Sequence, residues 1–292
     1  MDVDEPRGPR GGSPGGGRSR SPGRAGRNLP VAIGVGVGLG ALVVAALYTI
    51  KLAFVALAIV AVGLAVWELA RALGAGGARV PLIPVLVGAV AMLVGAYERG
   101  AGALVVIVAL TAVAVFVWRL PEGADGYVRD VSAGVFASVY VPFLAGFVMM
   151  LLSPHDGPDR VMTFVGVTTC SDIGGYFVGV LVGRHPLAPT ISPKKTWEGL
   201  AGSAAASVAC GIGLVWWLLH GDLWEGAVLG GAVVCAATLG DLGESMMKRD
   251  LGIKDMGSLL PGHGGVMERL DSILLGAPVA WIVLTALVPP PS

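Results

Sequence analysis

The sequence predicts an all-α, polytopic integral membrane protein. Apolar residues make up 54% of the 292-residue chain, whereas only 14% of the residues are charged. A soluble domain of this size usually carries about 25% charged residues. The apolar residues are also grouped in runs of about 20, which is long enough for a helix to cross a bilayer. Low charge and long apolar runs together indicate several membrane helices.

The first 28 residues differ from the rest of the chain. They are rich in Gly, Pro, Ser and Arg and offer almost nothing to bury, so we expect residues 1–28 to form a disordered basic tail. Its six arginines suit a signal for membrane orientation, and contact with anionic lipid headgroups is the alternative. The tail is unlike a secretory signal peptide, because the apolar run that follows it is too long.

From Leu29 onward the apolar segments follow one another closely. We expect about nine transmembrane helices, with residues 29–160 as an N-terminal group and residues 161–292 as a C-terminal group that carries the catalytic site. The predicted spans are 30–50, 52–70, 80–97, 101–118, 131–152, 161–183, 200–219, 225–241 and 273–289.

The positions of the basic residues predict the orientation. With the N-terminus in the cytoplasm and nine alternating spans, 17 of the 20 Lys and Arg residues fall on the cytoplasmic side, and only Lys51, Arg99 and Arg160 fall outside. Cytoplasmic loops of membrane proteins carry such an excess. We therefore expect a cell-membrane protein whose N-terminus and two long polar loops, 184–199 and 242–272, face the cytoplasm.

The stretch from 240 to 272 is the densest in charge, with six acids and four bases. Asp241, Glu244, Ser245 and Lys248 follow one another at i, i+3, i+4 and i+7, which places them on one stripe of a helix. Two carboxylates on one stripe repel each other unless a cation lies between them, and their hard oxygen atoms suit Mg²⁺. The alternative is a solvated helix end with an ordinary Glu–Lys pair.

A basic, glycine-rich segment follows. Arg249 and Lys254 bring positive charge close to the acids, and the glycines of the segment 261–265 permit close backbone approach to a phosphate. His263 within it suits acid–base chemistry, and hydrogen bonding within the loop or phosphate binding are equally open roles.

A second carboxylate pair, Glu268 and Asp271, stands at i, i+3 where the last span begins, with Arg269 between its members. Two carboxylate pairs and several cations are what a site for a metal ion and a triphosphate requires.

Two further features lie upstream. Ser192, Lys194, Lys195 and Thr196 combine adjacent lysines with hydroxyls, which suits phosphate or an anionic headgroup; lysines that only set the topology are the alternative. Asp172 is an acid well inside a predicted span. Such carboxylates are costly and usually functional, and a hydrogen bond between helices is the alternative.

These residues together resemble a known signature. The run Ser245-x-x-Lys248-Arg249, Lys254-Asp255, Pro261-Gly262-His263-Gly264-Gly265 and Arg269-x-Asp271 is similar to that of the phosphatidate cytidylyltransferases, or CDP-diacylglycerol synthases. The segment from Ser192 to Gly199, which includes Glu198, is similar to a second segment of that family. The resemblance covers residues 167 to 289, and general hydropathy alone supports it before that.

One position departs from the family pattern. Glu268 stands where the family usually has Asp, at a position that the resemblance implies is a metal ligand. Glu is one methylene longer but still an oxygen donor, so we expect the metal to be retained with adjusted geometry.

The resemblance implies transfer of CMP from CTP to phosphatidate, which yields CDP-diacylglycerol and pyrophosphate. It implies Mg²⁺ as the cofactor, with a second metal ion left open. The implied catalytic residues are Asp241, Lys248, Arg249, His263 and Glu268. The implied metal ligands are Asp241, Glu244, Glu268 and Asp271. The implied substrate-binding residues are Ser192, Lys194, Lys195, Thr196, Ser245, Lys254, Gly264, Gly265 and Arg269. Asp172 and Glu198 belong to the same constellation without an assigned role.

The expected partners are CTP, phosphatidate and membrane lipids, with no nucleic acid, and the resemblance also implies a homodimer. A related CTP-dependent lipid enzyme, such as a polyprenol kinase or an ether-lipid cytidylyltransferase, is one alternative. A transporter whose ion path is lined by Asp172 and the polar loops is another. Because the polar residues gather at one membrane face and not through several spans, the enzyme is favoured over the transporter.

Overall fold

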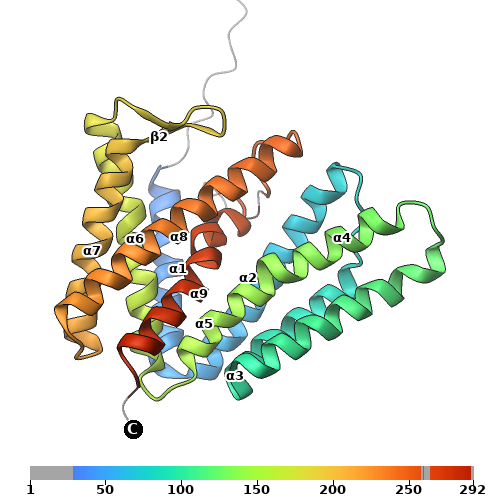
Figure 1. The fold of residues 1–292 in the computed structure, drawn as a ribbon, viewed down its shortest axis with the longest axis horizontal. Helices are drawn as coiled ribbons and strands as arrows, with labels where there is room; N and C mark the ends of the chain where they lie inside the picture. Colours follow the sequence, from blue (N-terminus) through green and yellow to red (C-terminus); the bar gives the residue numbers. More distant parts are fainter. Residues whose placement is uncertain (1–28, 258, 260–263, 291–292) are drawn as a thin grey trace, which may run out of the picture.

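Helices make up most of the residues that the structure describes, which confirms the predicted all-α class (Figure 1). The computed structural model describes residues 29–257, 259 and 264–290; the predicted tail, 1–28, and His263 lie outside the described residues. The helices are α1 (Leu29–Thr49), α2 (Lys51–Ala75), α3 (Leu82–Arg119), the short η1 (Leu120–Glu122), α4 (Tyr127–Ser138), η2 (Val139–Phe143), α5 (Leu144–Leu152), α6 (Gly157–Val182), α7 (Trp197–Leu218), α8 (Leu223–Asp250) and α9 (Met267–Leu287).

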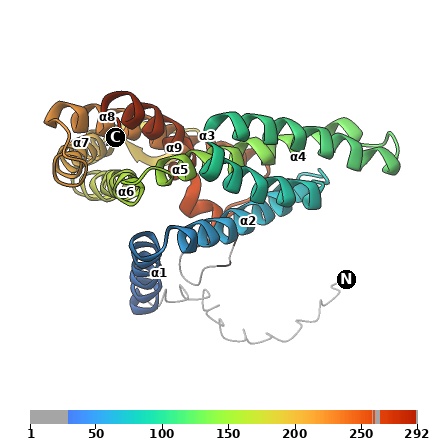
Figure 2. The same cartoon turned by 90° about the horizontal axis from the view of Figure 1, so that it is seen from below.

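Within the described residues, seven helical stretches are long and apolar enough to cross a membrane, and Gly36–Thr49 of α1 is a shorter apolar helix. The class of polytopic membrane protein is therefore confirmed. The number of nine spans stays a prediction, because the stretch Leu82–Glu122 contains both the third and the fourth predicted span. Figure 2 shows α1 at the edge of the bundle, and the Tyr48 hydroxyl of α1 donates a 2.8 Å hydrogen bond to Asp159 of α6.

The long helix α3 is bent back on itself at Gly100. This residue has φ 70° and ψ −155°, a conformation outside the helical region that glycine adopts without a steric cost. Gly88 lies against Thr111 and Gly95 lies against Ile107, so the two halves of α3 run antiparallel. The bend falls between the predicted spans 80–97 and 101–118.

The predicted span 131–152 is one continuous helical stretch made of α4, η2 and α5. Its centre, Val139–Phe143, is a π-helical turn that contains Pro142. Proline has no backbone N–H to donate and its ring crowds the preceding turn. The wider turn accommodates the proline without ending the helix.

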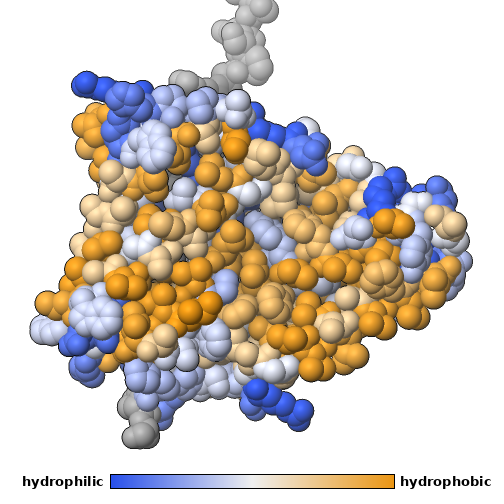
Figure 3. Space-filling view, in the orientation of Figure 1, coloured by the Kyte–Doolittle hydropathy of each residue, from blue (hydrophilic) through white to orange (hydrophobic). Residues whose placement is uncertain are grey.

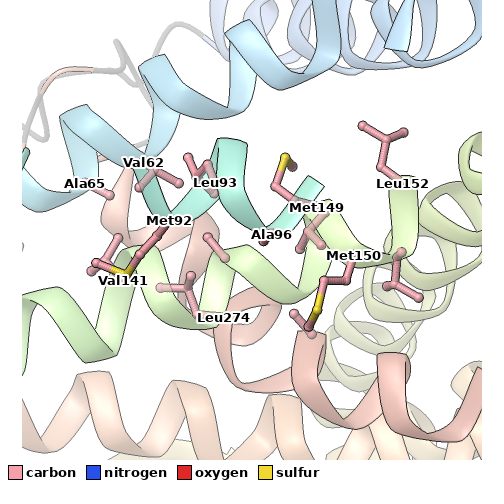
Figure 4. Close-up of a cluster of buried hydrophobic side chains, with 14 of the residues drawn as sticks. Val62, Ala65, Met92, Leu93, Ala96, Val141, Met149, Met150, Leu152 and Leu274 are labelled. Atoms are coloured by element: carbon pink, nitrogen blue, oxygen red, sulfur yellow. The ribbon is translucent and has the colours of Figure 1, made fainter. Parts of the chain in front are cut away.

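The central core lies where α2, α3, α5 and α9 meet (Figure 4). Met92, Met149 and Leu274 are fully buried there, and the small side chains of Ala65 and Ala96 are buried beside them. Water does not drive helices together within a bilayer, so close packing of small and flexible side chains is a main source of their association. This core positions α2 and α9 next to each other.

The turns at one end of the bundle are joined by contacts. The Asp130 carboxylate accepts a hydrogen bond of 2.8 Å from the backbone N–H of Arg79, which connects the first turn of α4 to the α2–α3 turn. Gly76, just after α2, lies against Leu251, just after α8. The α2–α3 turn, the start of α4 and the end of α8, all predicted to be near the cytoplasm, thus lie together at one end.

The remaining turns meet at the opposite end. The Ser153 hydroxyl donates to the carbonyl of Tyr97 at 2.8 Å, and Arg160 Nη2 donates to the carbonyl of Val288 at 2.7 Å. These contacts group the bend of α3, the α5–α6 turn and the end of α9. Figure 3 shows a broad apolar surface over the middle of the helices with polar residues toward the ends, as a membrane-spanning bundle requires.

Two predicted polar loops differ from expectation. The loop 184–199 contains a two-stranded antiparallel hairpin of β1 (Pro186–Ala188) and β2 (Ser192–Thr196), which the all-α prediction did not include. The predicted span boundaries at 241 and 273 are too short, because α8 continues through the predicted helical stripe to Asp250 and α9 begins at Met267. Charged pairs one turn apart can stabilise a helix beyond its apolar, membrane-spanning part. Hydropathy alone assigns such a polar extension to the neighbouring loop. Only 251–266 separates α8 from α9.

Candidate functional site

Three elements form the candidate site at one end of the bundle: the last turns of α8, the first turns of α9 and strand β2. The stripe predicted on α8 exists, since Asp241, Glu244, Ser245 and Lys248 all lie within the helix. Glu268 and Asp271 lie in the first turns of α9. Because α8 and α9 pack side by side, the two carboxylate pairs predicted from spacing face a common region.

Lys195 brings the hairpin to α8. Its Nζ lies 2.5 Å from Asp241 Oδ2, and both side chains are about one-quarter exposed. Sequence reasoning placed these residues in the site separately, 46 positions apart. The structure pairs them, so a basic residue predicted to bind a phosphate neutralises a carboxylate predicted to bind a metal.

A pocket of about 260 Å³ opens beside this ion pair. It lies between α6, α7, α8 and the hairpin, and its polar lining includes Ser171, Asp172, Lys194, Lys195, Thr196 and Asp241. The carboxylate of Asp172 is therefore part of the same site as the two lysines. A pocket with both signs of charge can receive a phosphate group next to a bound cation.

Lys248 connects the two helices on the other side of the cluster. Its Nζ lies 3.1 Å from Glu244 Oε2 and 3.5 Å from Glu268 Oε1. Glu244 is only 3% exposed, and its Oε1 has no hydrogen-bond partner among the described residues. Asp271 lies within electrostatic range of Glu244 and of Asp241. The predicted acids are thus brought together around one buried, incompletely paired carboxylate.

Glu268 has a second contact that sequence spacing did not predict. Its Oε2 accepts a 2.9 Å hydrogen bond from the backbone N–H of Gly265, just before α9. Glutamate near the start of a helix often reaches back in this way to a free backbone N–H. Gly264 beside it has φ +82°, which favours glycine. Glu268 therefore binds Gly265, the last residue of the predicted phosphate loop, as well as facing Lys248.

The remaining basic residues line a separate pocket on α8. Ser245, Lys248, Arg249 and Lys254 contribute to its wall together with Ile191 at the tip of the hairpin. Arg249 Nε donates a hydrogen bond to the Ile191 carbonyl, so α8 and the hairpin are also tied together here. Arg269 lies on the first turn of α9, and its guanidinium group is near enough to Asp172 for an electrostatic interaction.

Three of the predicted residues have structural contacts in the hairpin. Thr196 Oγ1 accepts from the Gly199 N–H at 3.1 Å and so caps α7. Glu198 accepts from the backbone N–H of Arg184 at 3.1 Å and lies 2.5 Å from the ring of His185. Ser192 pairs with Ala188 in the sheet. These contacts fix the hairpin that presents Lys194 and Lys195.

The donor set fits a divalent cation. Oxygen atoms from two helices converge, and Glu244 keeps a buried oxygen atom without a partner among the described residues, which a metal ion would satisfy. Lys248 takes part of that role in the structure, with its ammonium group between Glu244 and Glu268. In the part of the chain that the structure describes, no three His, Cys, Asp or Glu side chains already stand in metal-coordinating geometry.

Sequence reasoning missed Glu68. It lies on α2, within the predicted span 52–70, so it is a second acid inside a predicted span besides Asp172. Its side chain is 1% exposed, and its Oε2 accepts a 2.9 Å hydrogen bond from the backbone N–H of Met267, the first residue of α9. An acid within the apolar run of α2 was the available signal.

Comparisons with known proteins agree with these features. The model of the cytidylyltransferase family matches residues 30–287, so the likeness extends well before residue 167. The phosphatidate cytidylyltransferase of Mycobacterium leprae is 45% identical over 282 residues, 90% of each chain. That of Mycobacterium tuberculosis (strain H37Rv) is 44% identical over 278 residues, 90% of this chain and 84% of the relative. That of Synechocystis sp. is 41% identical over 141 residues, 47% of each chain.

Proposed function

Because the chain belongs to the cytidylyltransferase family, we propose that it transfers CMP from CTP to phosphatidate and so forms CDP-diacylglycerol and pyrophosphate. One observation carries the assignment to this site. Asp241, Glu244, Lys248 and Glu268 meet at one end of the bundle, and Lys195 joins them from the hairpin. Carboxylates and cations in this arrangement suit a metal-bound triphosphate.

The chemistry needs no nucleophile from the protein. An oxygen of the phosphatidate phosphate bonds to the α-phosphorus of CTP, and the bond from that phosphorus to the oxygen bridging the α- and β-phosphorus breaks. Pyrophosphate leaves with the bonding electron pair. The attacking phosphate is already ionised, so no strong base is required. The protein contributes position and electrostatic stabilisation.

The cations would divide between two substrates. Lys194 and Lys195 line the pocket between α6, α7 and α8, and we assign them to the phosphatidate headgroup, with CTP as the alternative. Lys248, Arg249 and Lys254 line the pocket on the other side and would offset the charge of the triphosphate and of the leaving pyrophosphate. Gly264, Gly265 and Arg269 would complete the nucleotide side.

Asp241, Glu244, Glu268 and Asp271 would hold Mg²⁺, which when bound offsets negative charge on the triphosphate. Two carboxylate pairs leave donors for a second metal ion. In this proposal Lys248 keeps Glu244 and Glu268 together in the free protein and turns toward phosphate when nucleotide binds, because one ammonium group lies within 3.5 Å of both acids.

We place the protein in the cell membrane with its N-terminus and the site on the cytoplasmic side. The excess of basic residues at this end supports that orientation, and CTP is available there. Phosphatidate would enter from the bilayer. A homodimer is part of the proposal by resemblance to the family.

The deciding experiment uses the purified full chain in detergent with CTP, Mg²⁺ and phosphatidate. We expect release of pyrophosphate together with formation of CDP-diacylglycerol, and loss of both when the metal is chelated. Absence of pyrophosphate release with active membrane extracts as a positive control would overturn the proposal. Parallel reactions with a polyprenol and with an ether-linked phosphatidate analogue test the alternative substrates.

A further inference from the structure

Glu68 lies outside every segment assigned to the chemistry, yet it contacts the start of α9. Its Oε2 accepts the 2.9 Å hydrogen bond from the Met267 backbone N–H, and only 1% of the side chain is exposed. The first backbone N–H groups of a helix have no partner within the helix, and a carboxylate there is favoured by the helix dipole. Glu68 thus caps α9 from a different helix, 199 residues away in sequence.

The same carboxylate lies against both ends of the loop before α9. A Cβ atom added to Gly265 would lie 2.5 Å from Glu68 Oε2, and one added to Gly257 would collide with Glu68 Oε1. Both residues are glycines, which lets the backbone approach the buried carboxylate. Glu68 therefore lies against both Gly257 and Gly265, while its hydrogen bond goes to the Met267 N–H at the start of α9.

The contacts continue into the predicted metal ligands. Gly265 donates its N–H to Glu268 Oε2, so Gly265 lies between the carboxylates of Glu68 and Glu268. Glu268 and Asp271 follow Met267 by one and four residues. The rotation and height of the first turn of α9 set the position of both carboxylates, and Glu68 fixes that turn.

We infer that Glu68 is a positioning residue: it holds the first turn of α9 and the adjoining Gly265 so that Glu268 and Asp271 reach the metal–nucleotide site. This inference rests on the proposed function of that site. A misplacement of a catalytic group by about 1 Å can cost about 100-fold in rate, so the loss of Glu68 should be felt in catalysis without any contact to substrate.

The test compares Glu68→Ala with Glu68→Gln. Glutamine has the same length and keeps an oxygen atom that can accept the Met267 N–H, whereas alanine removes the acceptor. We expect Glu68→Ala to lower kcat about 100-fold and to raise the Mg²⁺ concentration needed for half-maximal activity. Glu68→Gln should have a kcat and a Mg²⁺ requirement close to those of the unchanged protein. A metal requirement equal to that of the unchanged protein in a folded Glu68→Ala variant would overturn the inference.

Leu69→Ala is the matched control for a structural effect. Leu69 is the next residue of α2 and is fully buried, so its truncation loosens the packing of α2 but leaves the Glu68 hydrogen bond in place. We expect it to lower the thermal stability and the folded fraction while the Mg²⁺ dependence per folded protein stays unchanged. The same shift in Mg²⁺ dependence for Leu69→Ala and Glu68→Ala would contradict a specific role of Glu68.

Hydrogen–deuterium exchange gives a readout that does not depend on activity. In the metal-free full chain, we expect peptides that cover 264–271 to exchange faster in Glu68→Ala than in Glu68→Gln or Leu69→Ala. Equal protection in all three would overturn the inference even if the enzyme is active. If the unchanged protein shows no CTP-dependent reaction, the proposed function fails, while faster exchange in Glu68→Ala would still establish the positioning of α9.

Discussion

At the scale of single residues, Glu268 combines two roles that sequence spacing could not separate. Its Oε1 faces Lys248 at 3.5 Å, whereas its Oε2 accepts the Gly265 N–H at 2.9 Å. A shorter aspartate at this position would not reach both partners in the same way. The longer side chain at this position, where the family usually has Asp, is thus used to bind the Gly265 N–H before α9.

Substitutions of Glu268 test this dual role. Glu268→Gln should keep the thermal stability, because an amide oxygen still accepts the Gly265 N–H, but should lower activity by about 100-fold through loss of a charged ligand. Glu268→Ala should lower both the thermal stability and the activity. Glu268→Asp should stay active with a changed Mg²⁺ requirement. Activity titrated against Mg²⁺, with melting curves as the control, measures each effect. Full activity in Glu268→Ala would remove Glu268 from the site.

A buried ion pair makes the strongest residue-level prediction for stability. Arg119 and Asp130 are 3% and 0% exposed, and Arg119 Nη2 lies 2.7 Å from Asp130 Oδ2. Arg119→Ala would leave the Asp130 carboxylate without its closest charged partner, which destabilises the fold. We expect a marked fall in the melting temperature in detergent. The exposed Arg99→Ala variant is the control, and a similar melting temperature for both variants would contradict the prediction.

At the scale of elements, helix ends and bends determine what the site looks like. The predicted spans placed most helices within a few residues, because long apolar runs are a strong signal. The pattern failed where polar residues extend a helix past the bilayer core, at the end of α8 and the start of α9. It also did not foresee the hairpin of β1 and β2, since two short polar strands leave little trace in hydropathy.

Gly100 offers a test of the bend in α3. A side chain at φ 70° and ψ −155° costs about 1–3 kcal/mol. Gly100→Ala should therefore lower the melting temperature. Gly102→Ala is the matched control, since a Cβ atom added to Gly102 would meet no atom within 4 Å and its φ is not positive. An equal or higher stability of Gly100→Ala would show that α3 does not bend there.

At the scale of the whole molecule, contacts between turns group the polar segments at two ends. The site, the α2–α3 turn and the α3–α4 turn share one end, as Gly76 with Leu251 and Arg79 with Asp130 demonstrate. The bend of α3 and the α5–α6 turn share the other. This grouping agrees with the alternating inside and outside turns predicted from the basic residues. Which of the two ends faces the cytoplasm stays a prediction.

Cysteine labelling measures directly which end of the bundle faces the cytoplasm. Cys170, Cys210 and Cys235 are free thiols, so they are first replaced by alanine. A single cysteine is then introduced by Asp125→Cys at the α3–α4 turn or by Arg99→Cys at the bend of α3. In intact cells a membrane-impermeant maleimide should label the Arg99→Cys variant alone, and both should react after permeabilisation. The opposite pattern would reverse the proposed orientation.

The sequence by itself determined the membrane class, the approximate helices and the identity of the charged residues at the site. Apolar run length, charge distribution and the spacing of Asp241, Glu244 and Lys248 are local properties, so they can be read along the chain. Only the tertiary structure decided which partners meet. The pairing of Lys195 with Asp241 and of Glu68 with Met267 joins residues 46 and 199 positions apart. Such contacts depend on how the helices pack, which no local pattern encodes.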